Sequence, residues 1–442
     1  MRVSFVGLGY VGLTTAVCMA VKGFRVTGID VDIGKIDLIR NGKPAFKEPG
    51  LEKLLSRVTS AKNFRCSTEY SDILGTDITF ITVGTPSRQD GSIDLTQVVK
   101  ASKNIGEALA GSSKPHTVVV KSTVVPGTTK SHVRQALEQA SGRVVGEGLN
   151  LCVNPEFLRE GNAVKDTFKP DRIVIGDDWG GAGRVLLNLY RKFYGGRMPP
   201  IIRTNTVNAE MIKYASNVFL AARISLINEI ANVCQHIPEA DVTLVAWGVG
   251  LDKRIGRHFL NAGLGYGGSC FPKDVKALTA YAKSLGYHPA ILEAVEKVNS
   301  SQPYKAVELA ENLVGELSGK KAAVLGLSFK PNTDDVREAV ALKIIDRLLE
   351  VGCSVAVYDP VAMDNVRRVY GGKLAYASSA EECLRGADFC IVATEWDEFR
   401  KLKPRDFRKH MRNPVVIDGR RIYDPEAFSK SLRYAAVGLG NK

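Results

Sequence analysis

The first part of the chain alternates short apolar runs with segments whose apolar residues recur every three to four positions. The short runs predict strands, and the longer period predicts amphipathic helices. Strands and helices that alternate in this way build a parallel sheet through right-handed crossovers, hence a doubly wound α/β domain. The predicted strands are 3–6, 24–30, 77–84, 116–123, 149–155 and 172–176, and the predicted helices include 13–22, 94–110 and 128–140.

Residues 207–236 contain neither glycine nor proline and keep apolar residues on a helical period. The pattern predicts one long helix, about 45 Å for thirty residues, followed by further helices to about residue 298. Because apolar side chains occupy more than one side, the helix is interpreted as a subunit interface or a core strut. A plain linker between two lobes is an equal alternative on the pattern alone.

The last third returns to strand and turn units, at 354–360, 389–394 and 414–424. The predicted fold class is therefore α/β, with two doubly wound, Rossmann-like parallel-sheet domains joined by a central helical domain with one long helix. The expected boundaries are 1–200, 201–303 and 304–442.

Composition and charge narrow the class of protein. The formal net charge is +13 over 442 residues, but Lys and Arg form no long blocks and no nucleic-acid-reading motif stands out. An anionic small molecule is therefore the expected partner rather than nucleic acid. We expect no signal peptide, no membrane span and a cytoplasmic location. Eight cysteines without a CxxC pair, and six histidines without metal-ligand spacing, predict neither structural disulfides nor a bound metal.

The segment Gly7-Leu8-Gly9-Tyr10-Val11-Gly12 matches the dinucleotide-binding fingerprint GxGxxG. It follows a predicted strand and opens a predicted helix, and the next strand ends at Asp30. In such a turn the first glycine permits the bend, the second admits the pyrophosphate and the third lets the helix approach the strand. An acid at Asp30 would bind a ribose diol and repel a 2′-phosphate, which favours NAD over NADP. The alternatives are a purely structural turn and an NAD-binding regulator without catalysis.

The stretch GLGYGGSCFPKD, 263–274, places one thiol after four glycines. Pro272 suits the first position of a helix, so Cys270 is expected just ahead of a helix N-terminus and beside Lys273. Both the helix dipole and a nearby cation lower the pKa of a thiol and make it a better nucleophile. The glycines are interpreted as room for a ligand beside the backbone. Asp274 in the first turn has an ordinary alternative role as a stabilising N-terminal acid.

Five motifs resemble the UDP-glucose/GDP-mannose dehydrogenase family, in order and over nearly the whole chain. They are NPEFLREG (154–161), KYASNVFLAARISLINE (213–229), GYGGSCFPKD (265–274), GLSFKPNTDDVRE (326–338) and IDGRRIYD (417–424). The resemblance implies an NAD-dependent, four-electron oxidation of the C6 alcohol of a nucleotide sugar to a uronate. It proceeds through an aldehyde, a thiohemiacetal on Cys270 and a thioester that water hydrolyses.

The resemblance implies UDP-glucose as the substrate, with UDP-galactose, GDP-mannose and UDP-N-acetylmannosamine as alternatives. Asn261 stands where many relatives have Lys or Arg. A two-electron dehydrogenase of hydroxy acids, which needs no thiol, and a silent NAD-binding regulator are the rival functions. Arg254 matches an arginine offered from a neighbouring subunit, which implies a homodimer or a larger homo-oligomer.

The same resemblance assigns roles residue by residue. Cys270 is the nucleophile. Lys213 and Asn217 bind the sugar, and Lys213 also stabilises an oxyanion. Asp274 assists proton transfer, Glu156 is the general base for water, Glu160 lies near the reacting carbon, and Thr123 holds a catalytic water. A paired surface lysine and a strand-end threonine are the ordinary alternatives for Lys213 and Thr123. The implied cofactor residues are Gly7, Gly9, Tyr10, Val11, Gly12, Asp30, Lys35, Thr85, Thr123, Glu160 and Arg337. The implied substrate residues are Glu156, Phe157, Leu158, Lys213, Asn217, Arg254, Phe259, Leu260, Asn261, Gly265, Gly267, Phe329, Lys330, and Arg420 or Arg421 for the phosphates.

Overall fold

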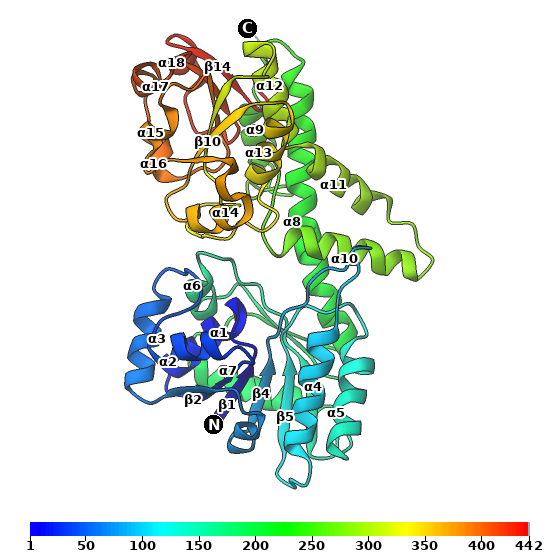
Figure 1. Cartoon of the computed structure of the whole chain (residues 1–442). Coiled ribbons are helices and arrows are strands. Elements are labelled where there is room, and N and C mark those ends of the chain that lie inside the picture. The colour runs from blue at the N-terminus through cyan, green and yellow to red at the C-terminus, as the bar shows by residue number, and fades with distance from the viewer. Residues whose placement is uncertain (441–442) are drawn as a thin grey trace. The chain divides into compact units, whose positions relative to one another are not determined.

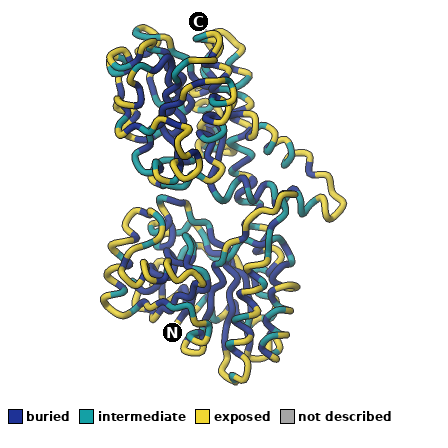
Figure 2. The backbone as a smooth tube through the Cα atoms, viewed as in Figure 1, coloured by how far each residue is buried: buried dark blue, intermediate teal, exposed yellow. Residues whose placement is uncertain are grey.

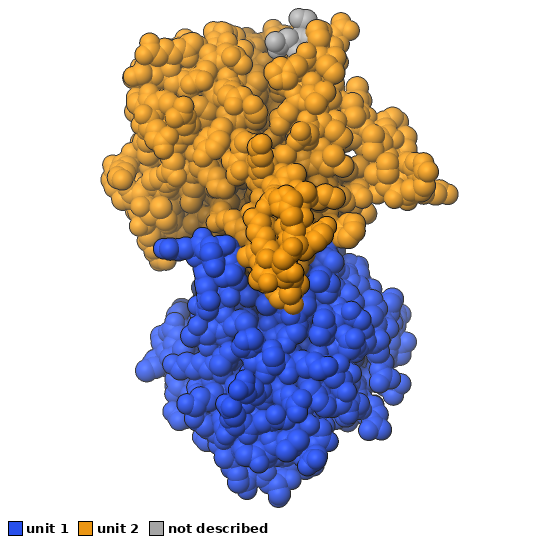
Figure 3. Space-filling view, turned by 90° about the vertical axis from the view of Figure 1, so that its right-hand side faces the viewer, with its two compact units in different colours: residues 1–216 blue, residues 217–442 orange. Residues whose placement is uncertain are grey.

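The computed structural model describes residues 1–440. It divides the chain into two compact units, Met1–Ser216 and Asn217–Lys442, which Figure 3 colours separately. Each unit holds one sheet. The predicted fold class, two doubly wound sheets with a helical segment that contains one long helix, is confirmed. The predicted division into three domains, with 201–303 as a separate one, stays a prediction.

The N-terminal unit has an eight-stranded sheet in the order β3-β2-β1-β4-β5-β6-β7-β8. The order 3-2-1-4-5-6 of its first six strands is that of dinucleotide-binding folds. Its strands are β1 (Arg2–Val6), β2 (Arg25–Ile29), β3 (Phe64–Ser67), β4 (Ile78–Ile81), β5 (His116–Val120), β6 (Leu149–Val153), β7 (Ile173–Gly176) and β8 (Ile201–Thr204). Its helices are α1 (Tyr10–Val21), α2 (Ile33–Arg40), α3 (Leu51–Ser60), η1 (Tyr70–Gly75), α4 (Thr96–Leu109), η2 (Thr129–Val133), α5 (Arg134–Ser141), α6 (Ala163–Phe168) and α7 (Ala182–Tyr194).

One strand departs from the predicted parallel sheet. β7 runs antiparallel to β6, whereas β8 runs parallel to β7. Strands β1 to β6 are parallel throughout. The apolar run at 172–176 predicted the strand but not its direction, because direction depends on the path of the connecting segment rather than on the residues of the strand.

The C-terminal unit repeats the strand order in a smaller, fully parallel sheet, β11-β10-β9-β12-β13-β14. Its strands are β9 (Lys321–Leu325), β10 (Ser354–Tyr358), β11 (Ala375–Tyr376), β12 (Phe389–Val392), β13 (Val415–Asp418) and β14 (Arg433–Ala436). Around it lie α12 (Tyr304–Val314), α13 (Val340–Glu350), α14 (Met363–Tyr370), η3 (Gly371–Lys373), α15 (Ala380–Leu384), α16 (Asp397–Arg400), α17 (Pro404–His410) and α18 (Pro425–Ser429).

The helical segment that follows β8 in the chain begins with the predicted long helix, α8 (Thr206–Gln235), whose first eleven residues belong to the N-terminal unit. It continues with α9 (Val242–Gly250), α10 (Phe271–Ser284) and α11 (Ala290–Ser301). Figure 1 shows α8 as one continuous helix. The absence of glycine and proline over thirty residues removes the usual causes of kinks and breaks.

Helices cover both faces of each sheet (Figure 1). In the N-terminal unit α1, α3 and α7 pack on one face, and α4 and α5 on the other. In the C-terminal unit α12, α13 and α14 cover one face, and α15, α17 and α18 the other. Strands buried on both sides must be apolar at nearly every position, as in β4 with ITFI, and Figure 2 shows the strands as the buried centre of each unit. Among the described residues no helix combines the length and apolarity needed to cross a bilayer.

Candidate active site

The turn between β1 and α1 has the geometry that its glycines predicted. Gly7 has φ +95°, and its N–H donates to Ile29 O at 2.8 Å. A Cβ at Gly12 would lie 1.9 Å from Gly7 O, so only glycine lets α1 lie this close to the turn. At Gly9, by contrast, a Cβ would meet no atom within 4 Å. Space therefore exists beside Gly9, next to the first amides of α1, which have no partner inside the helix.

Asp30, directly after β2, completes this corner. Its carboxylate accepts from Leu8 N at 2.7 Å and from Lys35 Nζ at 2.9 Å. The predicted cofactor residues of β1, α1 and β2 are thus brought together, and Lys35 is paired with the acid rather than isolated. Thr85 is buried after β4, and Thr123 is half-buried after β5, at the same carboxyl edge of the sheet. The glycine turn, the open helix start and the acid fit a dinucleotide.

A buried ion pair lies at the end of β6. Glu156 Oε1 is 2.8 Å from Lys213 Nζ on α8, and both side chains are less than a tenth exposed. Glu156 Oε2 also accepts from Leu158 N at 2.6 Å. Burial raises the pKa of Glu156, but the Lys213 ammonium, the Leu158 N–H and the Lys121 ammonium outweigh it and lower the pKa below its usual value. Glu156 is therefore a carboxylate at neutral pH.

Lys121 is a residue of this site that the sequence interpretation missed. It is 6% exposed at the end of β5 and donates to Asn154 Oδ1 at 3.0 Å. Burial lowers the pKa of Lys121 to about 8; Glu156 raises it and Lys213 lowers it further. The available signal was its place in the segment KSTVVPG, two residues before Thr123. With a pKa of about 8, Lys121 is mainly protonated at neutral pH and loses its proton above pH 8, which changes the charge around Glu156 and Lys213.

The other predicted residues of the NPEFLREG segment are buried or half-buried near the Glu156–Lys213 pair and the start of α1. Phe157 is half-buried, with the Arg172 guanidinium carbon 3.9 Å and Lys213 Nζ 5.5 Å from its ring centroid. Glu160 is 9% exposed, and its charge is among the influences that raise the pKa of Tyr10, after burial and the hydrogen bond to Glu48. This segment therefore groups Glu156, Phe157, Leu158 and Glu160 around Lys213 and the start of α1.

In the C-terminal unit, Cys270 is the N-cap residue of α10. The sequence predicted Pro272 as the first residue of the helix, but the helix begins one residue earlier, at Phe271. Cys270 therefore directly precedes the first helical residue. Cys270 is half-exposed, its Sγ is 3.5 Å from Ser269 Oγ, and its carbonyl accepts from Asp274 N at 2.9 Å. The thiol thus lies at the positive end of a fourteen-residue helix.

Asp274, in the first turn of α10, is 1% exposed and bonded on both oxygens. Oδ2 accepts from Asn217 Nδ2 at 2.5 Å, and Oδ1 is 2.6 Å from Lys273 Nζ. Asn217 and Asp274, which were predicted from separate motifs, are therefore hydrogen-bonded to each other. Lys273 forms an ion pair with Asp274. Helix α8 carries Lys213 and Asn217 about one turn apart, so that it supplies one residue to each cluster.

The glycines before Cys270 pack closely against other segments of the same unit. A Cβ at Gly265 would lie 2.7 Å from Asn299 Oδ1, one at Gly267 would lie 2.2 Å from Glu338 O, and one at Gly268 would lie 2.7 Å from the Phe329 ring. Protein atoms fill the space beside these glycines. Close packing of Asn299, on α11, and of the 326–338 segment therefore requires glycine at these positions, and the interpretation that the loop also leaves room for a sugar stays a prediction.

The two candidate arginines differ in surroundings. Arg420 donates to Ala393 O at 2.7 Å and to Gly265 O at 3.3 Å, at the glycine loop. Arg421 is buried in an ion pair with Asp241 at 2.6 Å. Arg420 is therefore the arginine that lies at the loop before Cys270.

The other predicted substrate residues of this unit lie on loops. Phe259 is half-exposed with φ +61°, Leu260 is buried and Asn261 is exposed. Phe329 packs against Gly268, and Lys330 Nζ is 5.2 Å from the Phe329 ring centroid. Arg254 has an 89% exposed side chain paired with Asp252, and Arg337 pairs with Asp335 at 2.7 Å. Their assigned roles stay predictions.

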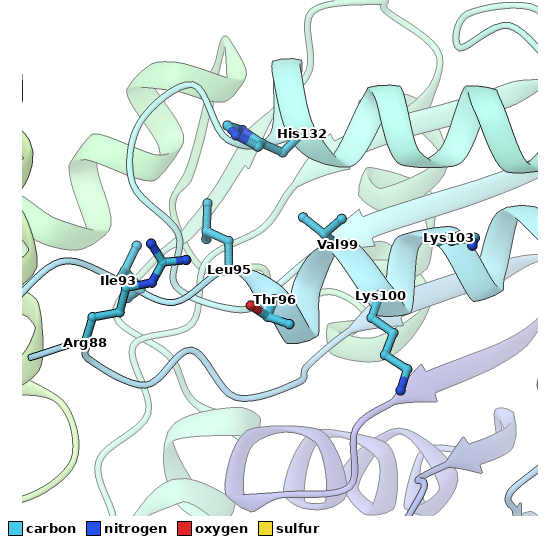
Figure 4. A pocket seen from close by; sticks show the side chains of 8 residues that line it. All are labelled: Arg88, Ile93, Leu95, Thr96, Val99, Lys100, Lys103 and His132. Carbon is cyan, nitrogen blue, oxygen red and sulfur yellow. The ribbon is translucent and has the colours of Figure 1, made fainter.

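A cavity of about 550 Å³ in the N-terminal unit contains none of the predicted residues. It lies over the start of α4, and Figure 4 shows Lys100 directed away from His132 across it. Its basic side chains do not converge on one point, so it is a surface hollow rather than a second candidate site. Among residues 1–440, no three His, Cys, Asp or Glu side chains lie close enough together to hold a metal ion.

Comparison with known proteins assigns all three parts of the chain to one family. Residues 1–194, 207–301 and 323–425 match the NAD binding, central and UDP binding domains of the UDP-glucose/GDP-mannose dehydrogenase family. The chain belongs to this family. An NAD-dependent dehydrogenase is therefore the confirmed enzyme class, and NAD the confirmed cofactor.

Similar proteins extend along the whole chain. The UDP-glucose 6-dehydrogenase AglM of Haloferax volcanii is 45% identical and covers 96% of this chain and 97% of its own length. YwqF of Bacillus subtilis, also a UDP-glucose 6-dehydrogenase, is 41% identical, with 99% and 98% coverage. The structure of a UDP-glucose dehydrogenase from Pyrobaculum islandicum has a TM-score of 0.92 at 42% identity and covers 99% of this chain and 98% of its own.

Proposed function

We propose that this protein oxidises the C6 alcohol of UDP-glucose to the carboxylate of UDP-glucuronate. One sugar, two NAD⁺ and one water give the uronate, two NADH and three protons. The observation that carries the proposal is Cys270 at the start of α10, with Asp274 buried one turn on and hydrogen-bonded to Asn217. A thiol held at a helix N-terminus is suited to a covalent acyl intermediate, which a two-electron dehydrogenase does not need.

NAD, which the glycine turn and Asp30 would hold, would supply the hydride acceptor for each oxidation. In the first, we assign Lys213 to the sugar's C6 oxygen, where its ammonium stabilises negative charge as the alcohol loses its proton. Glu156, 2.8 Å from that ammonium and ionised, is suited to accept the proton directly or through a water. Lys121 adds a second cation to the same corner, so the alkoxide forms in a positively charged setting.

In the second oxidation the Cys270 thiolate adds to the aldehyde carbon, and the hydride leaves the thiohemiacetal to give a thioester. Asn217 binds the sugar oxygen, and Asp274, held by Asn217 and Lys273, directs proton transfer at the same carbon. Water then attacks the thioester; Glu156 is its base, Thr123 holds it, and Glu160 lies near. The C–S bond breaks, and the thiol returns with a proton from the attacking water.

We assign the nucleotide part of the substrate to the C-terminal unit. Arg420, at the carbonyl of Gly265, is the phosphate-binding arginine of the pair, since Arg421 is committed to Asp241. Lys330 is the second phosphate contact. The loop with Phe259, Leu260 and Asn261 grips the base and sugar mainly through its backbone. UDP-glucose is preferred over UDP-galactose, GDP-mannose and UDP-N-acetylmannosamine because four relatives at 40–45% identity carry the name UDP-glucose 6-dehydrogenase.

The test is product formation from these four nucleotide sugars, followed through NADH absorbance and mass analysis. UDP-glucose is expected to give the highest kcat/KM and two NADH per sugar. One NADH per sugar would support a two-electron dehydrogenase, and no NADH with any sugar would support the regulator. Cys270→Ser is expected to lower uronate formation at least about a hundredfold; Cys66→Ser, on β3, is the control. Uronate formation at the wild-type rate in Cys270→Ser would refute the thioester route.

We also propose that the enzyme is a homodimer or a larger homo-oligomer in the cytoplasm. Phe219, Leu226 and Val233, spaced by two helical turns, form an apolar stripe on α8, and their exposures are 72%, 62% and 56%. On α9, Leu244 and Trp247 are 68% and 57% exposed. A patch of this kind is costly to leave in water and fits a second copy of the chain. The described cysteines form no disulfide, as suits a reducing compartment.

The oligomer test is light scattering of the purified protein and of Leu226→Asp. The variant places a charge in the middle of the stripe and is expected to be monomeric, with the wild type at least dimeric. Arg254→Ala, which removes the arginine proposed to reach the neighbouring subunit, should lower activity without changing mass. A wild-type monomer at micromolar concentration would contradict this part of the proposal.

A further inference from the structure

Tyr10 and Glu48 form a buried clasp on the segment that carries Glu160. Glu48 is 7% exposed, two residues before Gly50, the N-cap residue of α3. Its Oε2 accepts from the Tyr10 hydroxyl and from Gly161 N, the latter at 2.7 Å, and its Oε1 accepts from Val164 N at 3.4 Å. Gly161 N also lies 2.9 Å from the Tyr10 hydroxyl oxygen. Donors from two distant parts of the sequence, Tyr10 and the 161–164 segment, therefore meet at the Glu48 carboxylate.

The clasp joins the cofactor turn to the acid-bearing segment. Tyr10 is the first residue of α1, inside the glycine fingerprint, and Gly161 directly follows Glu160. The Tyr10 ring also packs on Phe46, with ring centroids 5.0 Å apart, and this contact fixes the direction of the hydroxyl. Burial, followed by the hydrogen bond to Glu48, raises the pKa of Tyr10, so the phenol remains a donor at every working pH.

The segment has a second anchor on its other side. Arg159 bonds Asp166 on α6 through its backbone N–H at 3.0 Å and through its guanidinium at 3.0 and 2.6 Å. Residues 159 and 161 are thus both fixed, and Glu160 lies between them at 9% exposure. The bonds between Arg159 and Asp166 use no atom of Tyr10 or Glu48, and the direct contact between the two anchors is a long one, from the Tyr10 hydroxyl to Arg159 O at 3.4 Å. We therefore expect that loss of the clasp releases one side of Glu160 and leaves the other in place.

We propose that Tyr10 and Glu48 are positioning residues, which hold the Glu160 segment in register with the cofactor turn during hydride transfer. This inference rests on the proposed function. The backbone of Tyr10 belongs to the helix start that faces the cofactor, whereas its side chain binds the Glu160 segment. Movement of that segment away from α1 changes the distance over which hydride must pass, and catalysis is steeply sensitive to such displacement. Affinity for NAD itself depends on the glycine turn, which has its own contacts.

The test is a double-mutant cycle with Tyr10→Phe, Glu48→Gln and the double variant. Each single change is expected to lower kcat for UDP-glucose about tenfold. The kcat of the double variant should lie within about threefold of that of the less active single variant, because both changes remove the same contact. Dissociation constants for NAD, measured without sugar, should stay within about threefold of wild type. Glu48→Ala, which keeps no acceptor, should lose more kcat than Glu48→Gln.

A kinetic isotope effect separates positioning from loss of folding. With UDP-glucose deuterated at C6, the isotope effect on kcat should be larger in Tyr10→Phe than in wild type, because hydride transfer becomes the slow step. Glu52→Gln, at an exposed position on α3, and Tyr287→Phe, at an exposed tyrosine, are the matched controls and should leave all constants unchanged. Thermal unfolding of each variant checks the fold.

Three outcomes would overturn the inference: unchanged kcat in both single variants, fully multiplicative losses in the double variant, or a loss of NAD affinity that parallels the loss of kcat. Failure of the proposed function is seen separately, since the wild type would then oxidise none of the four nucleotide sugars. NAD binding by the wild type and the two controls remains measurable in that case.

Discussion

The two sheets of this protein begin with the same turn but use it differently. Gly7 after β1 has φ +95° and Gly326 after β9 has φ +93°. Each donates its N–H at 2.8 Å to the carbonyl at the end of the neighbouring strand, Ile29 O for Gly7 and Tyr358 O for Gly326. In both turns an acid directly after that strand accepts from the residue after the glycine: Asp30 from Leu8 N at 2.7 Å, and Asp359 from Leu327 N at 2.8 Å.

The two units differ in the segment that comes after the turn. In the N-terminal unit α1 begins at once, so its open amides lie beside the acid; in the C-terminal unit the next helix, α13, begins only at Val340. Asp30 reaches the half-buried Lys35, whereas Asp359 is 1% exposed and accepts from Trp396 Nε1 at 3.0 Å. The glycine turn is therefore a way to pack a strand on its neighbours, and dinucleotide binding needs the helix start and a reachable acid in addition.

The largest effects are expected where a methyl group would strike the turn itself. Gly12→Ala places Cβ 1.9 Å from Gly7 O, and Gly326→Ala places it 2.4 Å from Thr394 Cβ at positive φ. Each substitution should lower the free energy of unfolding by about 2–5 kcal/mol, because the added methyl group overpacks the turn and, at Gly326, also strains the backbone. Urea unfolding measures the free energy of unfolding of each variant. Only Gly12→Ala should also abolish NAD binding; loss of NAD binding in Gly326→Ala would remove the distinction between the two turns.

A pH-dependent stability is expected from Glu210 in the N-terminal unit. Burial raises the pKa of Glu210 to about 7, although Thr129 and the N–H of Gly127 counteract it. The folded state then binds a proton more tightly than the unfolded one, so this group's contribution to stability falls as pH rises from about 4.5 to 7 and is constant above. The total is on the order of 3 kcal/mol. Glu210→Gln should flatten thermal stability over this range; an unchanged pH profile would contradict the shift.

Gly9→Ala tests the space at the helix start without disturbing the fold. No heavy atom lies within 4 Å of the added Cβ, and φ is −73°. Unfolding should be unchanged, while NAD affinity falls about tenfold or more because the methyl group occupies the path of the pyrophosphate. Gly196→Ala, another open glycine without positive φ, is the control. Equal NAD affinity in both variants would place the cofactor elsewhere.

The smallest effects on NAD binding are expected from the two acids. Asp30→Asn should weaken NAD several-fold and improve the relative affinity for NADP, because the negative charge no longer opposes the 2′-phosphate. Asp359→Asn should leave both affinities unchanged and lower stability by about 1–3 kcal/mol, since a buried acceptor of several donors is lost. Calorimetry with both cofactors distinguishes them. A change in cofactor preference in Asp359→Asn would contradict the comparison.

The sequence predicted a large part of the fold for a simple reason. Strands buried on both faces are apolar at nearly every position, as in β4, and α8 runs thirty residues without a helix breaker. It missed β3, where FRCS alternates in burial, and β8, whose four residues are only partly buried or exposed. It also missed the two edge strands of the second sheet, β11 and β14. Strands without a continuous apolar run carry little signal. Family membership likewise came from motifs that are long, specific and in order.

The sequence by itself determined the turn chemistry, the long helix and the single thiol ahead of a helix start. Only the tertiary structure decided which partners these groups have: Lys213 with Glu156, Asp274 with Asn217, and Glu48 with Tyr10. It also showed that the space beside the glycines before Cys270 is filled by Asn299, Glu338 and Phe329, and that β7 reverses direction. The physical reason is the same in each case. Periodicity and propensity are local, whereas ion pairs, buried acceptors and the space beside a glycine depend on residues far away in the chain.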